Sequence, residues 1–275
     1  MKITVFYDHV REACEQTGKS LAEVAQIIRE HGVSGVEMDY AQLKHHTGKK
    51  LRELKKAGVP VVSVYTFFDW GNHPEDRSYK KLLRKLHRYG IRYVLAVPGF
   101  VQNEKDRTLY RERMADVLRD MCSYAAKMNI QVSMEDFDDS SAVFAKGTEV
   151  KWFLDRIPAL SCAFDTGNFI YSEEQAEKML PMLIDRIGYV HCKDRSLQEK
   201  DEETPKKTIG GRNLYSASVG SGVIPMEEIL EHIIQSGYDG NYAIEHFGSK
   251  HQLADITASA DWLLNVLKKY EKQEK

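Results

Sequence analysis

Short apolar, β-branched stretches alternate with amphipathic stretches along the whole chain. In the first amphipathic stretch, Leu21, Val24 and Ile28 recur at helical spacing, and Ser20 precedes them as an N-cap with Glu23 in the first turn. Strands are predicted at residues 3–7, 35–38, 59–66, 93–97, 130–135, 160–165, 189–193 and 242–245. Helices are predicted at 20–31, 51–58, 79–90, 109–128, 150–157, 176–187, 226–234 and 253–267, with Pro181 distorting or dividing one of them.

Eight strand-then-helix units predict an α/β fold with a parallel sheet and crossover helices. The 275 residues suit a (β/α)8 TIM barrel, and no shift in composition divides the chain, so we expect a single barrel domain over residues 1–275. An open, doubly wound sheet is the alternative. The Gly-rich phosphate turn of that fold is missing after the first strand, where the sequence reads Tyr7-Asp8-His9-Val10.

The connection over residues 194–225, after the seventh strand, is longer than the others and is polar, charged and glycine-bearing. Connections of this length inside a compact domain are usually functional or disordered. We therefore expect a long loop that is either a lid over the barrel mouth or a solvated insertion.

Composition and charge give no support for nucleic-acid binding or membrane insertion. A formal net charge of -2 gives no general attraction to nucleic acid or to an anionic membrane. No apolar run approaches the roughly 20 residues that span a bilayer, and the N-terminus reads as a strand rather than a signal peptide. We expect a cytoplasmic protein whose four cysteines are reduced.

The last four strands carry the candidate chemistry. Alternate side chains of a strand point to opposite faces of the barrel wall. In these strands one alternate set is bulky and apolar and is predicted to face the helices: Val132, Met134, Phe164, Val190 and Ile244. The other set is predicted to face the barrel axis and ends in an ionisable residue on each strand: Glu135, Asp165, His191 and Glu245. These four side chains are therefore expected together at the C-terminal mouth, where active sites of this fold lie.

Three carboxylates in one small cavity require a compensating cation. Oxygen donors with one imidazole suit one divalent metal ion, with Mn2+ expected first and Mg2+, Co2+ or Zn2+ as alternatives. The competing interpretation is a set of unrelated ion pairs at the top of the barrel.

At these residues the chain resembles a known family. The segments Met134-Glu135-Asp136, Phe164-Asp165-Thr166-Gly167-Asn168, Val190-His191-Cys192-Lys193-Asp194 and Ile244-Glu245 resemble signatures of the xylose isomerase-like TIM barrels. The resemblance implies that Glu135, Asp165, His191 and Glu245 are the metal ligands. One departure is Asn168, because many members have a histidine at this position.

The resemblance also implies an activity. We expect a metal-dependent sugar isomerase or epimerase that acts on a ketose or keto-sugar through an enediolate, with Glu135 and Glu245 transferring protons on opposite faces. A lyase that dehydrates a keto-polyol or a 3-keto sugar, as inosose dehydratase does, is the alternative. An endonuclease IV-like activity is disfavoured because it needs more metal-binding histidines and basic DNA-binding loops, whereas only His191 is predicted to point inward and the net charge is near zero. A non-catalytic metal-binding barrel is disfavoured because all four ligand positions are filled.

Substrate contacts are expected from five further residues: Asn168, Lys193, Glu37, Arg212 and Trp70. Lys193 has inward parity, although a salt bridge to Asp194 or Glu37 would explain it equally well. Arg195 and Arg212 lie in the long connection and are candidates for meeting an anionic substrate. The partner is expected to be a small sugar or polyol, and the family resemblance implies a homo-oligomer.

Overall fold

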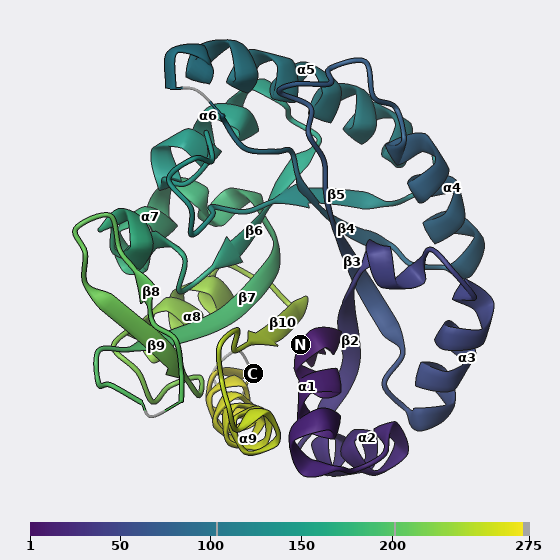
Figure 1. Cartoon of the computed structure of the whole chain (residues 1–275), viewed down its shortest axis with the longest axis vertical. Coiled ribbons are helices and arrows are strands. Elements are labelled where there is room, and N and C mark those ends of the chain that lie inside the picture. The colour runs from purple at the N-terminus through teal and green to yellow at the C-terminus, as the bar shows by residue number, and fades with distance from the viewer. Residues whose placement is uncertain (103, 201, 272–275) are drawn as a thin grey trace.

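The computed structural model describes residues 1–102, 104–200 and 202–271 and confirms the predicted (β/α)8 barrel (Figure 1). Each barrel strand pairs in parallel with its neighbours, and β10 closes the ring by pairing with both β1 and β7. The barrel strands are β1 (Lys2–Phe6), β2 (Val33–Asp39), β3 (Val61–Phe67), β4 (Tyr93–Val97), β5 (Gln131–Met134), β6 (Leu160–Asp165), β7 (Ile187–Ser196) and β10 (Asn241–Glu245).

Helices surround the strands, as Figure 1 shows. They are α1 (Tyr7–Thr17), α2 (Leu21–Glu30), α3 (Thr47–Ala57), α4 (Tyr79–Tyr89), α5 (Arg107–Ala126), α6 (Gly147–Arg156), α7 (Ala176–Leu183), α8 (Met226–Gln235) and α9 (Gln252–Glu271). Helix α1 was not predicted, because residues 7–17 are largely polar and only Tyr7, His9, Val10 and Ala13 are buried. Pro181 lies inside α7, which ends two residues later at Leu183.

The two predicted faces of the strands are confirmed. Val132, Met134, Phe164, Val190 and Ile244 lie in the large apolar cluster that joins the barrel to its helices. A separate, smaller cluster fills the barrel axis and contains Phe6, Tyr65, Leu95, Ala163, Tyr189 and Ala243. The axis is therefore a packed core with the functional residues above it, as in other barrels of this kind.

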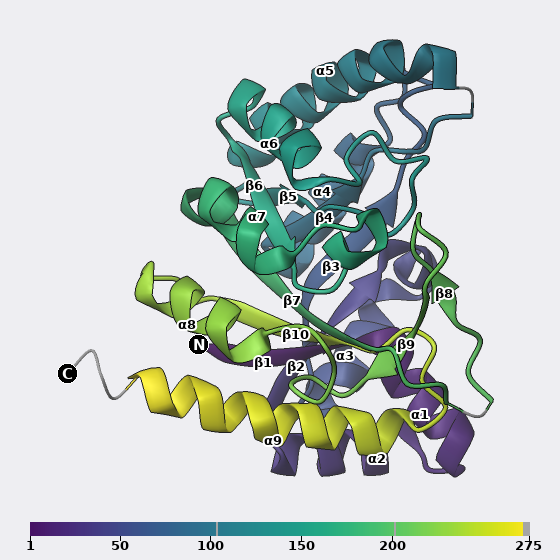
Figure 2. The same cartoon turned by 90° about the vertical axis from the view of Figure 1, so that its left-hand side faces the viewer.

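Residues 194–225 contain more regular structure than the loop expected from sequence. Strand β7 continues to Ser196, and its last three residues pair antiparallel with β9 (Asn213–Ala217). Strand β9 in turn pairs with the short β8 (Lys206–Lys207). In Figure 2, β8 and β9 lie on the side of the molecule opposite the start of β1. We call residues 194–217 the hairpin extension.

None of the helices in the described ranges is both long and apolar enough to cross a membrane. Cys14, Cys122, Cys162 and Cys192 form no disulfide.

Candidate metal centre

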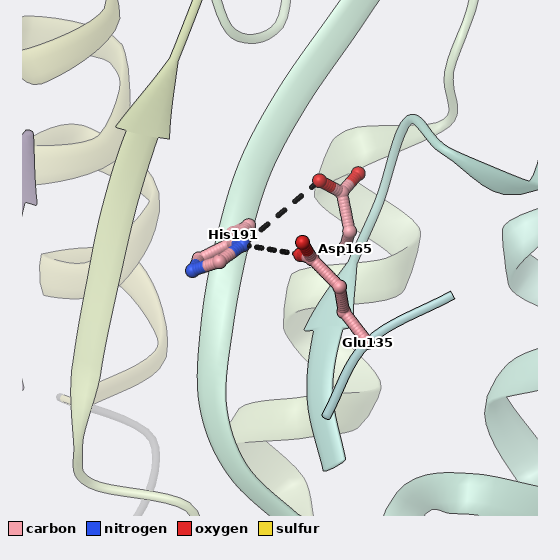
Figure 3. Close-up of side chains that lie close together, drawn as sticks. All are labelled: Glu135, Asp165 and His191. Atoms are coloured by element: carbon pink, nitrogen blue, oxygen red, sulfur yellow. Dashed lines mark hydrogen bonds and ion pairs between the residues drawn. The ribbon is translucent and has the colours of Figure 1, made fainter. Parts of the chain in front are cut away.

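Glu135, Asp165 and His191 converge at the C-terminal ends of β5, β6 and β7 (Figure 3). One potential ligand atom from each lies within 4.8 Å of the others. The Nδ1 atom of His191 is 2.8 Å from Glu135 Oε2 and 4.0 Å from Asp165 Oδ2. All three side chains are buried. Two carboxylate oxygens and one imidazole nitrogen therefore lie close together inside the protein.

The backbone after β6 fixes Asp165. Its Oδ1 atom accepts hydrogen bonds from the backbone N–H groups of Gly167 (2.7 Å) and Asn168 (2.9 Å). Its Oδ2 atom is buried and has no hydrogen-bond partner. Burial raises the pKa of Asp165 well above its ordinary value, and the carboxylates of Glu245 and Glu135 add to this effect. A buried carboxylate oxygen without a hydrogen-bond partner, close to the candidate ligand atoms of Glu135 and His191, is suited to binding a cation.

Gly167 is required for this turn to lie against β7. A Cβ atom at this position would overlap the backbone carbonyl oxygen of Lys193. We expect Gly167→Ala to lower the free energy of unfolding by about 1–3 kcal/mol and to weaken metal binding, because β6 and β7 must separate. Thermal unfolding and metal titration would measure both effects.

Gly48→Ala in α3 is the matched control. A Cβ atom at Gly48 would meet only the side-chain ends of Arg52 and Tyr89, at 3.3 Å, and alanine favours a helix by about 0.5–1 kcal/mol. Equal behaviour of the two variants would contradict the steric argument.

A second carboxylate lies on the other side of His191. Glu37, in β2, is 0% exposed, and its Oε2 atom is 3.4 Å from His191 Nε2, an ion-pair distance at which neither atom has a hydrogen-bond partner. Burial would lower the pKa of His191, but Glu37 and Glu135 hold it well above its ordinary value. Carboxylates often fix metal-binding imidazoles in this way. Glu37 does not line the cavity described below, so its geometry fits the orientation of His191 instead of the expected contact with substrate.

Glu245 is not among the three side chains whose candidate ligand atoms all lie within 4.8 Å of one another, but it is close to one of them. Its Oε2 atom is 3.7 Å from His191 Nδ1, and its Oε1 atom forms a 2.7 Å salt bridge with Lys193 Nζ. Burial would raise the pKa of Glu245, but Lys193 and His191 outweigh it and lower the pKa below its ordinary value. Glu245 is therefore a carboxylate that stays ionised beside the site.

Lys193 connects the site to the hairpin extension. Besides Glu245, its Nζ atom contacts Asn168 Oδ1 at 2.6 Å and Asp138 Oδ2 at 3.4 Å. Asp138 also binds Lys206 of β8 at 2.6 Å. The alternatives expected from sequence, Asp194 and Glu37, are not its partners, and the Asp194 carboxylate accepts backbone hydrogen bonds from Arg195, Gly220, Gly222 and Ile224 instead.

A cavity of about 520 Å³ opens above these residues. Glu135, Asn168, Lys193 and Glu245 line it, together with Asp138, Tyr171, Arg195 and Lys206. Its apolar walls come from Phe6, Tyr65, Phe67, Leu95, Val97, Phe137, Leu214 and Phe247. The volume is typical of a small-molecule site, and polar and charged side chains make up about half of the residues that line it.

Two residues that were expected to bind substrate lie elsewhere. Trp70 is 0% exposed, stacks on Phe68 and packs against Tyr79, so its position is explained by core packing. Arg212 is exposed and lies 3.5 Å from Glu173, beside a different surface pocket. Neither residue lines the cavity.

The sequence did not single out several residues at the site. Asp138, Thr204, Lys206, Leu214 and Ser216 line the cavity, and four of these five come from the hairpin extension. Asp136 is buried beside Glu135, and neither oxygen of its carboxylate has a hydrogen-bond partner. The expectation of a lid over residues 194–225 was the sequence signal for the four residues of the hairpin extension.

Comparison with known proteins gives a consistent family and fold. The family model of the xylose isomerase-like TIM barrel matches residues 11–266. Inosose dehydratase of Lacticaseibacillus casei is 35% identical over 89 residues, which are 31% of this chain and 30% of that protein. The matched region thus spans about a third of this curated relative.

Two solved structures extend the likeness to nearly the whole chain. The IOLI protein with a bound zinc atom has a TM-score of 0.75 at 16% identity, covering 98% of this chain and 99% of that one. L-ribulose 3-epimerase has a TM-score of 0.72 at 15% identity, covering 100% of this chain and 97% of that one. At 15–16% sequence identity, the similarity to these two structures shows a shared fold and does not by itself show a shared activity.

Proposed function

Because this chain belongs to the xylose isomerase-like TIM barrel family, we propose that it is a divalent-metal-dependent isomerase or epimerase of a ketose or keto-sugar. The observation that carries the proposal is the convergence of Glu135, Asp165 and His191 beside a cavity that Glu135 and Glu245 line. Similarity to proteins described as a zinc-containing IOLI protein and as L-ribulose 3-epimerase supports it.

The donor set fits a divalent ion. Glu135, Asp165 and His191 would hold it, and Glu245 would complete the ligand set, with Mn2+ the ion we propose first and Mg2+, Co2+ or Zn2+ as alternatives. Such an ion supplies Lewis acidity toward a carbonyl substrate. The buried, partnerless Asp165 Oδ2 atom is the observation that supports this fit.

The protein's own groups would move the protons. Glu135 and Glu245 both line the cavity from different strands, β5 and β10, so each can face one side of a planar enediolate. Lys193 can donate a hydrogen bond to a substrate oxygen in place of its 3.4 Å contact with Asp138, while Asn168 Oδ1 holds the ammonium group in position. The apolar walls exclude water from the reacting carbon.

Dehydration is the second candidate. The similarity to inosose dehydratase favours it, as does the placement of Lys193, whose ammonium group lies beside Glu245 and could protonate a departing hydroxyl. Burial would lower the pKa of Lys193, but Asp138, Glu245 and Asp165 raise it well above its ordinary value, so the ammonium form prevails. Isomerisation, epimerisation and dehydration can share one enediolate. In the first two a proton returns to carbon, at the adjacent carbon or on the opposite face, whereas in dehydration the β-hydroxyl takes up a proton and leaves as water.

Incubating the Mn2+-loaded protein with ketoses, keto-sugars and inososes in D2O, and recording product masses, tests the proposal. One non-exchangeable deuterium without a change of formula is expected for an isomerase or epimerase. Loss of water from the substrate would establish a lyase instead. Unchanged substrates that also take up no deuterium would contradict both activities for the compounds tried.

A further inference from the structure

Arg195 is a buried cation without an ion-pair partner. It extends from β7 two residues beyond Lys193, lines the cavity and is 4% exposed. Its Nη1 atom donates a hydrogen bond to the Phe247 carbonyl oxygen at 3.1 Å, and its Nε atom has no partner. It forms no salt bridge with any residue in the described ranges. A buried charge normally has a counter-ion, because its desolvation is otherwise costly.

A second unsatisfied group lies next to it. Tyr171, in the 3-10 helix η3 (Phe169–Ser172), is 3% exposed and lines the same cavity. Its hydroxyl group has no hydrogen-bond partner, and the Arg195 Cζ atom is 5.5 Å from its ring centroid. Two buried donors from separate elements therefore lie beside one cavity, and both lack acceptors.

The other cations of the cavity wall are already paired. Lys193 contacts Glu245 and Asp138, and Lys206 contacts Asp138. Asp138 therefore serves both lysines, and Arg195 is the basic side chain of the described cavity wall that has no carboxylate within salt-bridge distance, although it helps to lower the pKa of Asp138 and of Glu245. An anionic group on the substrate would supply the negative partner for Arg195 that the protein does not provide.

We infer, on the basis of the proposed function, that the substrate carries an anionic substituent, a carboxylate or a phosphate, which pairs with the guanidinium group of Arg195 beside Tyr171. The guanidinium group suits this role because its planar donors match the oxygens of either anion. Arg195 is then a specificity-determining residue, while proton transfer stays with Glu135 and Glu245.

Calorimetric titration of the Mn2+-loaded protein with three matched sugars tests the inference. D-fructose is neutral, D-fructuronate adds a carboxylate and D-fructose 6-phosphate adds a phosphate. We expect at least one anionic sugar to bind about tenfold or more tightly than D-fructose, as a charge-assisted hydrogen bond allows. The anion that gains affinity identifies the substituent.

Variants tie this preference to the two donors. Arg195→Gln should bring the anionic sugar close to the affinity of D-fructose, and Tyr171→Phe should reduce the preference in part. Arg212→Gln is the matched control, because Arg212 comes from the same hairpin extension but is exposed and lies beside Glu173. Thermal unfolding and metal content would show that each variant is folded and loaded.

Equal binding of the three sugars, the absence of binding by all three, or a preference that survives Arg195→Gln would overturn the inference. The readout is affinity and does not require turnover. A preference that depends on Arg195, in a protein that gives no deuterium exchange or elimination, would support the anion site while contradicting the proposed function.

Discussion

Replacing Asp165 with asparagine is expected to leave a folded protein that no longer retains a divalent ion. The asparagine side-chain oxygen can still accept the hydrogen bonds that Asp165 Oδ1 receives from Gly167 and Asn168. The substitution removes the negative charge at Oδ2, the buried oxygen without a partner. We expect the affinity for Mn2+ to fall by more than about 100-fold, beyond the usual effect of changing a residue that only supports a ligand.

Stability separates this result from misfolding. Burial raises the pKa of Asp165, so in the metal-free protein the ionised carboxylate is disfavoured by folding. When folding raises the pKa of a carboxyl group, the protein loses stability as the pH rises from the pKa of that group in the unfolded chain to its pKa in the folded protein. Above that window, metal-free Asp165→Asn should therefore be at least as stable as the metal-free parent, and thermal unfolding with and without Mn2+ would measure this.

Asp155→Asn provides the matched control, because Asp155 is an exposed residue of α6 that pairs with Lys151. It should keep the full metal affinity and the stabilisation by Mn2+. If Asp165→Asn still binds one equivalent of Mn2+ with parental affinity, the assignment of the metal centre is wrong.

The barrel and the convergence of Glu135, Asp165 and His191 were predictable because both follow from strand periodicity. Phe164 and Asp165 are adjacent in β6, so the burial of Phe164 against the helices turns Asp165 toward the axis. The same alternation places His191 inward and Cys192 in the outer cluster. Parallel pairing then brings strand ends together without any knowledge of the loops.

Contacts set by the path of the connections were not predictable in this way. Lys206 reaches Asp138 only because β7 continues past the barrel and pairs with β9, a path that polar composition does not encode. Trp70 follows β3, as a cavity residue would, but the connection turns it into the core against Phe68. Arg212 lies in the hairpin extension, yet its side chain is outside the cavity.

Replacing Glu135 or Glu245 with glutamine is expected to reduce turnover by about 10²–10⁴-fold, the usual range for loss of a general acid or base. The two losses should differ in kind. If the glutamates serve opposite faces of the enediolate, the remaining one in each variant can still remove a proton from its own face and return it there. Each single variant should then exchange deuterium into one epimer without converting it to the other.

Metal binding should also distinguish the two positions. Glu135 belongs to the three residues whose donor atoms converge, whereas Glu245 Oε1 is held 2.7 Å from Lys193 Nζ. We therefore expect Glu135→Gln to weaken Mn2+ binding more than Glu245→Gln, and metal titration must accompany the kinetics. Measuring turnover and exchange at saturating Mn2+ separates lost proton transfer from lost metal.

Glu228→Gln, on the exposed face of α8, is the control and should match the parent in turnover, exchange and metal affinity. Retained turnover and exchange in one variant, with loss of both in the other, would show that a single glutamate handles both protons. That pattern suits aldose–ketose isomerisation, in which one base moves a proton between adjacent carbons. If both variants keep parental turnover at saturating Mn2+, neither glutamate transfers the proton, and Lys193, whose ammonium lies beside Glu245, becomes the residue to test.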